Sequence, residues 1–258
     1  MAVTYLDKIL ARHREMAEAD ARPLDPLVDQ AMAMAPARGF RRALAGRDRL
    51  AVIAEIKRRS PSKGDLNIGL DPAVWARQYE AGGASCLSVL TDVEGFGGSV
   101  DDLQAARGSC SLPVIRKDFT VCEHDVVDAR LMGADCVLLI AAALDPSELA
   151  RFHRLAVDIG LDVLVEIHDE HELDHALAAD ATLIGVNQRD LVTFQVDHAR
   201  AVRMAGVIPD HAVKVAESGV RGSDDARMLH DAGYHAVLVG ETLVTSGDPI
   251  AAIGDLIG

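Results

Sequence analysis

Residues 50–64 read LAVIAEIKRRSPSKG, a short apolar run that leads directly into a basic loop containing serine. The run has the length and composition of a strand that is buried on both faces of a parallel sheet. In a doubly wound dinucleotide-binding sheet, the loop after the first strand carries the pattern G-x-G-x-x-G. Residues 57–64 lack that pattern. This stretch therefore favours a closed barrel over an open doubly wound sheet.

From residue 50 onward, strand-like runs and helix-like stretches alternate eight times. The runs are short and rich in Val, Ile and Leu, and they are Leu50–Ile56, Ser85–Leu90, Pro113–Arg116, Cys136–Ile140, Val163–Ile167, Leu183–Val186, Val213–Ala216 and Ala236–Val239. The expected helices between them include Pro72–Ala81, Glu123–Leu131, Pro146–Ile159, Glu170–Ala179 and Asp224–Ala232. Such alternation implies parallel strands with right-handed crossovers. Eight units predict an α/β fold, a (β/α)₈ TIM barrel.

Local signals mark the ends of several of these helices. Asp71 and Asp145 each precede a proline, as expected of an N-cap followed by proline at the first helical position. Small-residue turns precede every second strand, about two strand–helix units apart, at Gly83, Gly133, Asp180 and Gly233. A residue at such a place ends a helix in the left-handed conformation before the chain enters the next strand.

Residues 1–48 stand outside the eight units and predict an N-terminal helical extension to a barrel formed by residues 49–258. Leu6, Ile9 and Leu10, with Met16 further along, are spaced as one apolar helix face, and residues 27–35 could form a second helix. The extension could cover one end of the barrel or mediate self-association. The sequence is compatible with a monomer or a weak homo-oligomer.

Composition excludes several classes of partner. The formal net charge of −14 argues against nucleic-acid binding, which needs a basic surface. No apolar run approaches the length of a membrane span. The first fifteen residues carry several charges and do not resemble a signal peptide, and the four cysteines form no C-x-x-C pair or zinc-like cluster. We expect a cytoplasmic enzyme with free thiols and no metal.

Ionisable and amide side chains lie near or just after the ends of the predicted strands, one strand after another. They are Glu55 and Lys57, Lys117, Glu166, Asn187 and Arg189, and Glu217. In barrels of this type the active site is built at the carboxyl ends of the strands. Buried lysines and glutamates are costly unless they are paired. Opposite charges held close together would keep both lysines protonated and Glu55 and Glu166 ionised, ready for acid–base chemistry.

Glycines after the last two strands predict an anion site. Ser218-Gly219 and Gly240-Glu241 occupy the usual place of a phosphate cradle in this fold, where backbone N–H groups and a helix N-terminus meet the anion. Seven cations also follow strand ends, namely Lys57, Arg58, Arg59, Lys63, Arg116, Lys117 and Arg189. A locally positive pocket in an acidic protein suits a small anionic substrate such as a phosphosugar.

These stretches resemble, in order, the motifs of the indole-3-glycerol-phosphate synthase family. The matching stretches are residues 52–62, 88–92, 96–99, 114–119, 164–168, 185–191, 216–220 and 239–241. Gln188 is a minor departure, at a position where Asn or Ala would be as readily expected. The resemblance implies a TIM barrel with a helical extension. It also implies ring closure of 1-(2-carboxyphenylamino)-1-deoxyribulose 5-phosphate to indole-3-glycerol phosphate, CO₂ and water in tryptophan biosynthesis, with no cofactor.

The resemblance also implies roles for individual residues. Lys117 would be the general acid, and Lys57 would pair with the substrate carboxylate. Glu166 would act as base or electrostatic partner, with Glu55 assisting, and Asn187 and Glu217 would position sugar hydroxyls and Lys117. The implied binding residues are Ser60, Phe96, Phe119, Arg189 and Ser218 for the substrate, and Gly219, Gly240 and Glu241 for the phosphate.

Two other functions remain open at this point. A phosphoribosylanthranilate isomerase-like barrel would pair a strand-end cysteine with an aspartate, but Cys86 lies within a predicted strand and lysines occupy the acid positions. A non-catalytic barrel paralogue would have lost charged residues at the strand ends, and none is evidently lost.

Overall fold

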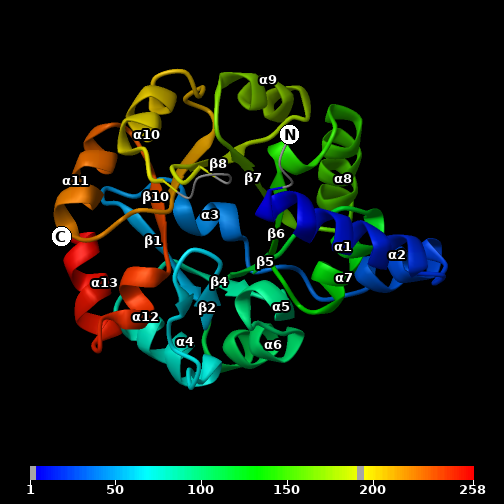
Figure 1. Ribbon diagram of the computed structural model, residues 1–258, viewed down its shortest axis with the longest axis horizontal. Helices are drawn as coiled ribbons and strands as arrows, with labels where there is room; N and C mark the ends of the chain where they lie inside the picture. Colours follow the sequence, from blue (N-terminus) through cyan, green and yellow to red (C-terminus); the bar gives the residue numbers. More distant parts are fainter. Residues whose placement is uncertain (1–3, 191–194) are drawn as a thin grey trace.

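The computed structural model describes residues 4–190 and 195–258. Its centre is a closed barrel of eight parallel strands, which helices surround in Figure 1. The barrel strands are β1 (Ala51–Ile56), β4 (Cys86–Leu90), β5 (Val114–Lys117), β6 (Cys136–Ile140), β7 (Asp162–Ile167), β8 (Leu183–Asn187), β9 (Val213–Glu217) and β10 (Ala236–Val239). Each strand pairs with the next along the chain, and β10 closes against β1. The predicted (β/α)₈ barrel is confirmed.

The elements around the barrel follow the strands in order. They are α4 (Pro72–Ala81), α5 (Val93–Phe96), α6 (Val100–Ser109), α7 (Glu123–Leu131), the 3₁₀ turn η1 (Ala141–Ala143), α8 (Pro146–Asp158), α9 (Glu170–Ala178), α10 (His198–Ala205), α11 (Ser223–Asp231), α12 (Glu241–Thr245) and α13 (Pro249–Ile257). A small hairpin, β2 (Arg59–Ser60) with β3 (Gly64–Asp65), folds the loop after β1. No helix among the described residues is long and apolar enough to cross a membrane.

The helix-end signals behave as the sequence predicts. The Asp71 carboxylate accepts from the backbone N–H groups of Ala73 and Val74, and Asp145 caps α8 in the same way. All four turn residues have positive φ, at Gly83, Gly133, Asp180 and Gly233. Within the eight strand–helix units, the predicted ends of helices and strands differ from the observed ones by one residue at most. Cap and turn chemistry therefore fixes where each unit of the barrel starts and stops.

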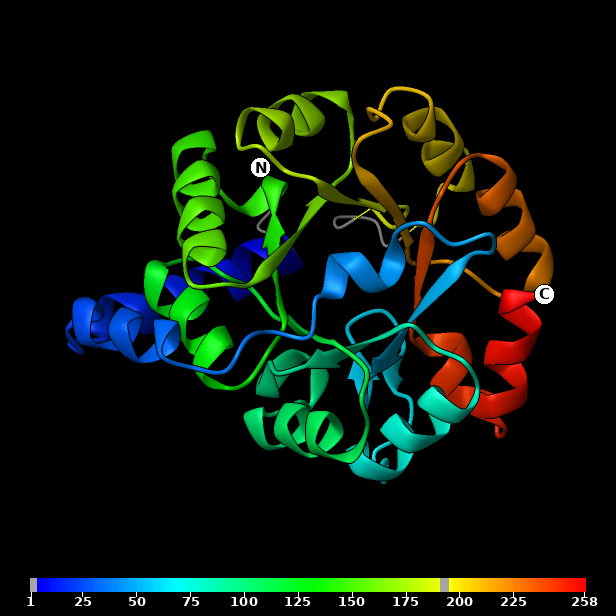
Figure 2. The same ribbon diagram turned by 180° about the vertical axis from the view of Figure 1, so that it is seen from behind.

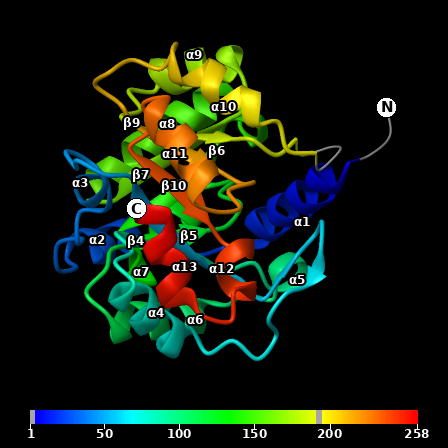
Figure 3. The same ribbon diagram turned by 90° about the vertical axis from the view of Figure 1, so that its left-hand side faces the viewer.

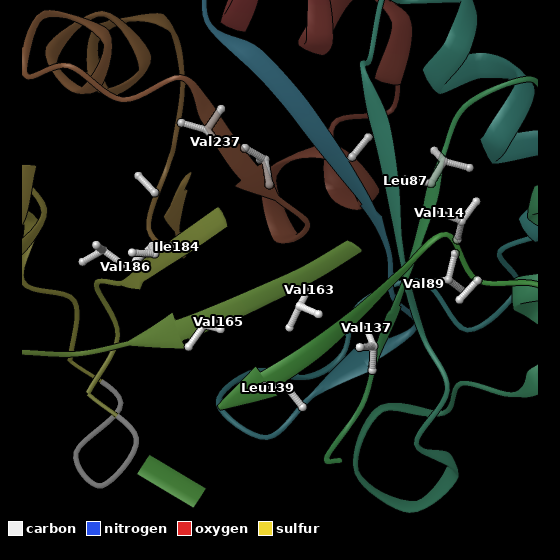
Figure 4. Close-up of a cluster of buried hydrophobic side chains, with 14 of the residues drawn as sticks. Leu87, Val89, Val114, Val137, Leu139, Val163, Val165, Ile184, Val186 and Val237 are labelled. Carbon is white, nitrogen blue, oxygen red and sulfur yellow. The ribbon is translucent and has the colours of Figure 1, made fainter. Parts of the chain in front are cut away.

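Alternate residues of each strand face two different cores. One cluster lies between strands and helices and includes Val137, Leu139, Val163 and Val165, which Figure 4 shows side by side. The second cluster fills the barrel and includes Ile53, Ile115, Leu138 and Leu164. Because side chains alternate along a strand, the residues two positions after the barrel-filling ones also point inward. This period places the polar strand ends inside the barrel mouth.

The extension forms three helices, α1 (Tyr5–Ala19), α2 (Leu24–Met32) and α3 (Phe40–Leu44). Helix α2 packs against α7, while α1 and α3 lie over opposite ends of the barrel (Figure 3). Phe40 and Leu44 of α3 are fully buried against the barrel-filling cluster, and Figure 2 shows α3 lying across that end. Helix α1 lies at the opposite end, which Figure 3 shows from the side. The sequence did not single out α3, because a five-residue helix carries little periodic signal.

Buried polar contacts hold α1 against the loops after β4 and β5. Nε2 of His13 lies 3.3 Å from a carboxylate oxygen of Asp92 and 3.7 Å from one of Asp118, and Arg12 pairs with Asp92. Arg14 reaches Glu148 at 3.0 Å on α8. These ion pairs fix the helix over the carboxyl ends of the strands.

Two expectations for the extension are wrong in detail. Met16 does not share the buried face, because it is 63% exposed. The second helix runs from Leu24 to Met32 and not over 27–35. Pro26 is accommodated in the first turn of that helix, where no intrahelical hydrogen bond is required of it.

Candidate active site

The polar strand ends point into one cavity at the end of the barrel that α1 covers. Its volume is about 450 Å³, within the usual range for small-molecule sites. Every residue predicted for the site lines it, namely Glu55, Lys57, Ser60, Phe96, Lys117, Phe119, Glu166, Asn187, Arg189, Glu217, Ser218, Gly219, Gly240 and Glu241. The strand period explains the convergence, since each charged strand-end residue follows a barrel-filling residue by two positions.

Three of the seven predicted cations do not line this cavity. Arg116 alternates with Lys117, so its side chain lies outside the barrel and contacts Asp118 at 3.2 Å. Arg58 binds Asp102, and Arg59 binds Asp65 across the β2–β3 hairpin. The positive charge in the cavity comes instead from Lys57, Lys63, Lys117 and Arg189, joined by Arg221, which the sequence did not single out.

Lys117 lies at the centre of the buried charges. Its Nζ is 3.3 Å from Oε2 of Glu166 and 3.7 Å from Oε2 of Glu217. Asn187 donates from Nδ2 to Oε1 of Glu166 at 3.0 Å, and its own Oδ1 accepts from the backbone of Arg189. Asn187 and Glu217 are also register partners on β8 and β9. The amide of Asn187 therefore orients the carboxylate of Glu166, and that carboxylate in turn holds the ammonium group of Lys117.

Burial and charge act in opposite directions on these groups. Burial lowers the pKa of Lys117, but the carboxylates of Glu166 and Glu217 outweigh it and leave the pKa above its ordinary value. Burial raises the pKa of Glu166, yet Lys117 brings it below the ordinary value. For Glu217, burial and the neighbouring Glu166 raise the pKa to about 8. At neutral pH the cluster therefore holds a protonated lysine, an ionised Glu166 and a largely neutral Glu217.

A neutral buried Glu217 predicts a specific pH dependence of stability. The folded protein keeps a proton on Glu217 that the unfolded chain, with its ordinary pKa of 4.5, releases. The free energy of unfolding should therefore fall as pH rises from about 4.5 to about 8. Glutamine does not titrate, so Glu217→Gln should lack this part of the pH dependence. Urea unfolding of the wild type and of the variant between these two pH values measures the difference in the free energy of unfolding. Parallel pH dependences would contradict a raised pKa, and Glu170→Gln on the exposed face of α9 is the matched control.

A second ion pair joins Glu55 and Lys57 at the mouth of the barrel. Nζ of Lys57 is 2.5 Å from Oε1 of Glu55, and Ser88 lies 3.4 Å from the other carboxylate oxygen. A Cβ added at Gly240 would overlap Oε1 of Glu55 and approach Nζ of Lys57 to 3.1 Å. Gly240 thus makes room for this pair, a role the sequence did not reveal.

One end of the cavity offers donors suited to an anion. Ser218 and Gly219 both have positive φ, at 63° and 77°, and α12 begins at Glu241. The carboxylate of Glu241 lies 3.7 Å from Lys63 and 4.0 Å from Arg189. Oγ of Ser60 is buried without a hydrogen-bond partner among the described residues. Cations and backbone donors therefore outweigh the single carboxylate at this end.

The other end is apolar and partly built by the extension. The rings of Phe96 and Phe119 lie 6.4 Å apart between centroids. Leu6 and Ile9 of α1 line the same cavity. The sequence placed these two residues on an apolar helix face, but that pattern could not tell which end of the barrel the face covers.

The described residues include one group of three possible metal ligands, His13, Asp92 and Asp118. Their carboxylates already contact cations, because Arg12 pairs with Asp92 and Arg116 with Asp118. This arrangement suits the attachment of α1 to the barrel.

Solved structures with the same fold differ widely in sequence. Thiamine phosphate pyrophosphorylase from Pyrococcus furiosus matches with a TM-score of 0.60 at 15% identity, covering 80% of this chain and 93% of that one. An N-acetylmannosamine-6-phosphate 2-epimerase from Clostridium perfringens matches with a TM-score of 0.61 at 12% identity, covering 76% and 89%. These two matches support the fold alone.

Sequence comparisons are much more specific. The family model described as indole-3-glycerol phosphate synthase matches residues 6–256. Indole-3-glycerol phosphate synthase 2 of Streptomyces coelicolor is 51% identical over 90% of this chain and 90% of its own length. Indole-3-glycerol phosphate synthase of Arthrobacter sp. strain FB24 is 49% identical over 98% of this chain and 95% of its own. The chain therefore belongs to the indole-3-glycerol phosphate synthase family.

Proposed function

We propose that this chain converts 1-(2-carboxyphenylamino)-1-deoxyribulose 5-phosphate to indole-3-glycerol phosphate, CO₂ and water. The observation that carries the proposal is Lys117, paired with Glu166 and Glu217 in a cavity with an aromatic end and an anion-binding end. Such a cavity suits a substrate with an aromatic ring at one end and a phosphate at the other. Lys117 then lies where the two parts must join.

Ring closure needs an acid at the ketone. The ring carbon that bears the carboxylate attacks the ketone carbon, and Lys117 donates a proton to the oxygen as the C=O π bond breaks. Loss of CO₂ returns its electron pair to the ring and restores aromaticity. The carboxylate of Glu166 stabilises the cationic intermediate and, through Asn187, keeps a fixed orientation.

Dehydration then needs a second acid and a base. The hydroxyl leaves as water with a proton from Lys57, and Glu166, assisted by Glu55, removes the remaining proton from the five-membered ring. Before that step, Lys57 pairs with the substrate carboxylate. The substrate's atoms are all accounted for in indole-3-glycerol phosphate, CO₂ and water, so the reaction needs no oxidant or reductant.

The remaining residues bind and orient the substrate. Phe96 and Phe119 pack on the ring, while Ser60 and Arg189 contact polar groups. The phosphate lies at Ser218, Gly219, Gly240 and Glu241, with Glu241 contributing chiefly its backbone N–H. Glu217, largely neutral, donates a hydrogen bond to a sugar hydroxyl and positions Lys117.

Product fluorescence tests the proposal directly. Incubation with the carboxyphenylamino-deoxyribulose phosphate in the presence of EDTA should yield indole fluorescence with release of one CO₂ per product. Turnover of phosphoribosylanthranilate without formation of indole would favour the isomerase-like alternative. Absence of both activities in the folded protein would favour a non-catalytic barrel.

Glu55→Gln should lower kcat more than it raises KM. The substitution keeps the shape of the side chain but removes the charge that holds Lys57 at 2.5 Å. A loss of about 10²-fold in kcat is expected for impaired proton transfer. Steady-state kinetics beside Glu170→Gln measure it, and an effect confined to KM would contradict the proposed role.

We also propose a cytoplasmic location and a monomer or weak homo-oligomer. The four cysteines, Cys86, Cys110, Cys122 and Cys136, are free thiols, which suits a reducing compartment. Sedimentation over a range of protein concentrations measures the oligomeric state.

A further inference from the structure

Gln188 follows Asn187 at the end of β8, but its side chain points away from the cavity and is fully buried. Nε2 donates to the backbone oxygen of Ser218 at 2.8 Å and approaches that of Glu217 at 3.4 Å. Its backbone N–H donates to the same oxygen of Glu217 at 3.1 Å. One residue therefore binds both carbonyl groups of the turn after β9.

That turn has an unusual backbone. Ser218 and Asp180 are the two non-glycine residues with positive φ in the described chain, and Asp180 lies at a helix end. Ser218 is followed by Gly219, also left-handed at 77°. A left-handed serine costs free energy and persists only where its surroundings hold it. The two hydrogen bonds from the Gln188 side chain supply that constraint.

His198 fixes the orientation of the amide. Nδ1 of His198 lies 3.2 Å from Oε1 of Gln188, and the two carbonyl groups on the other side require the NH₂ group there. A Cβ added at Gly219 would lie 3.2 Å from the His198 ring and 2.5 Å from Val196. His198 thus supports the turn twice, through Gln188 and by packing beneath Gly219.

We propose that Gln188, oriented by His198, is a positioning residue that holds the Glu217–Ser218–Gly219 turn in the conformation that binds the substrate phosphate. The inference rests on the proposed function, since it takes this turn as the phosphate site. It assigns to Gln188 the task of presenting the N–H groups of Ser218 and Gly219. Glu217 keeps its place beside Lys117 through the same contacts.

The test measures phosphate affinity separately from affinity for the ring. Gln188→Leu should weaken binding of inorganic phosphate and raise KM by about tenfold, because the carbonyl of Ser218 loses its side-chain donor while that of Glu217 keeps only the backbone N–H of residue 188. Kcat should change less than KM, and anthranilate, which lacks a phosphate, should bind as in the wild type. Titration calorimetry with each probe gives the affinities. The control is Gln104→Leu, the same change at an exposed position of α6.

A second variant keeps the test decisive if Gln188→Leu does not fold. His198→Phe preserves a ring beneath Gly219 but removes Nδ1, so it should weaken phosphate binding in the same direction by about threefold. Wild-type KM and wild-type phosphate affinity in either folded variant would overturn the inference. Absence of turnover in the wild type would instead overturn the proposed function, and phosphate affinity alone then decides the role of Gln188.

Discussion

Lys117→Met should lower kcat by about 10³-fold, the scale expected when a general acid is lost, and leave substrate affinity within about tenfold. Methionine has a similar length and fits the apolar part of the pocket, but it cannot protonate the ketone oxygen. The loss should therefore appear in the chemical step. Single-turnover measurements of indole fluorescence separate that step from binding.

A second substitution at Lys117 separates its charge from its acidity, and a lysine substitution elsewhere serves as the control. Lys117→Arg keeps the positive charge beside Glu166 but is a much weaker acid, so it should also lose about 10²-fold in kcat. Lys8→Met, an exposed change on α1, should match the wild type. Turnover close to wild type in Lys117→Met would refute Lys117 as the acid, and full activity in Lys117→Arg would reduce its role to charge alone.

Gly185→Ala, the smallest possible addition of a side chain, should lower kcat by about 10²-fold, as small displacements of catalytic groups do. Gly185 lies on the inward face of β8, opposite Glu166 in the strand register. A Cβ there would overlap Oε1 of Glu217 and lie 3.2 Å from Leu164. Either the carboxylate of Glu217 moves away from Lys117 or the backbone of β8 shifts. Overpacking of this kind also lowers the free energy of unfolding by about 1–3 kcal/mol.

The matched control is Gly108→Ala on α6, where an added Cβ meets nothing within 4 Å. That variant should keep wild-type turnover and gain slightly in stability, because alanine favours the helix. Kinetics and urea unfolding of both variants provide the comparison. Normal kcat in Gly185→Ala would mean that the position of Glu217 is not critical for catalysis.

The sequence predicted the barrel because strand and helix periods are local properties. Short apolar runs alternating with capped amphipathic stretches give eight units, and Asp71 and Gly83 mark helix ends as expected. The site residues were also predictable, since a polar residue that ends an apolar strand lies at the mouth of the barrel. The prediction for Arg116 was wrong because side chains alternate along β5: Lys117 points into the barrel, so the neighbouring Arg116 points out of it.

Contacts between segments that are far apart in the chain could not be predicted from the sequence. The apolar face of α1 was visible, but its place over the carboxyl ends of the strands depends on contacts of His13 with Asp92 and Asp118. The space beside Gly185 and the hydrogen bonds of Gln188 likewise join residues of β8 to the turn after β9.

The sequence by itself determined the eight-unit barrel, the charged residues at its mouth and the glycines that follow its last two strands, because each depends on the order and period of residues along one segment. The tertiary structure alone decided that Glu217 is largely neutral while Glu166 is ionised. Both are glutamates at strand ends, and what separates them is burial and distance to Lys117 and to each other. Those quantities exist only after the barrel has closed.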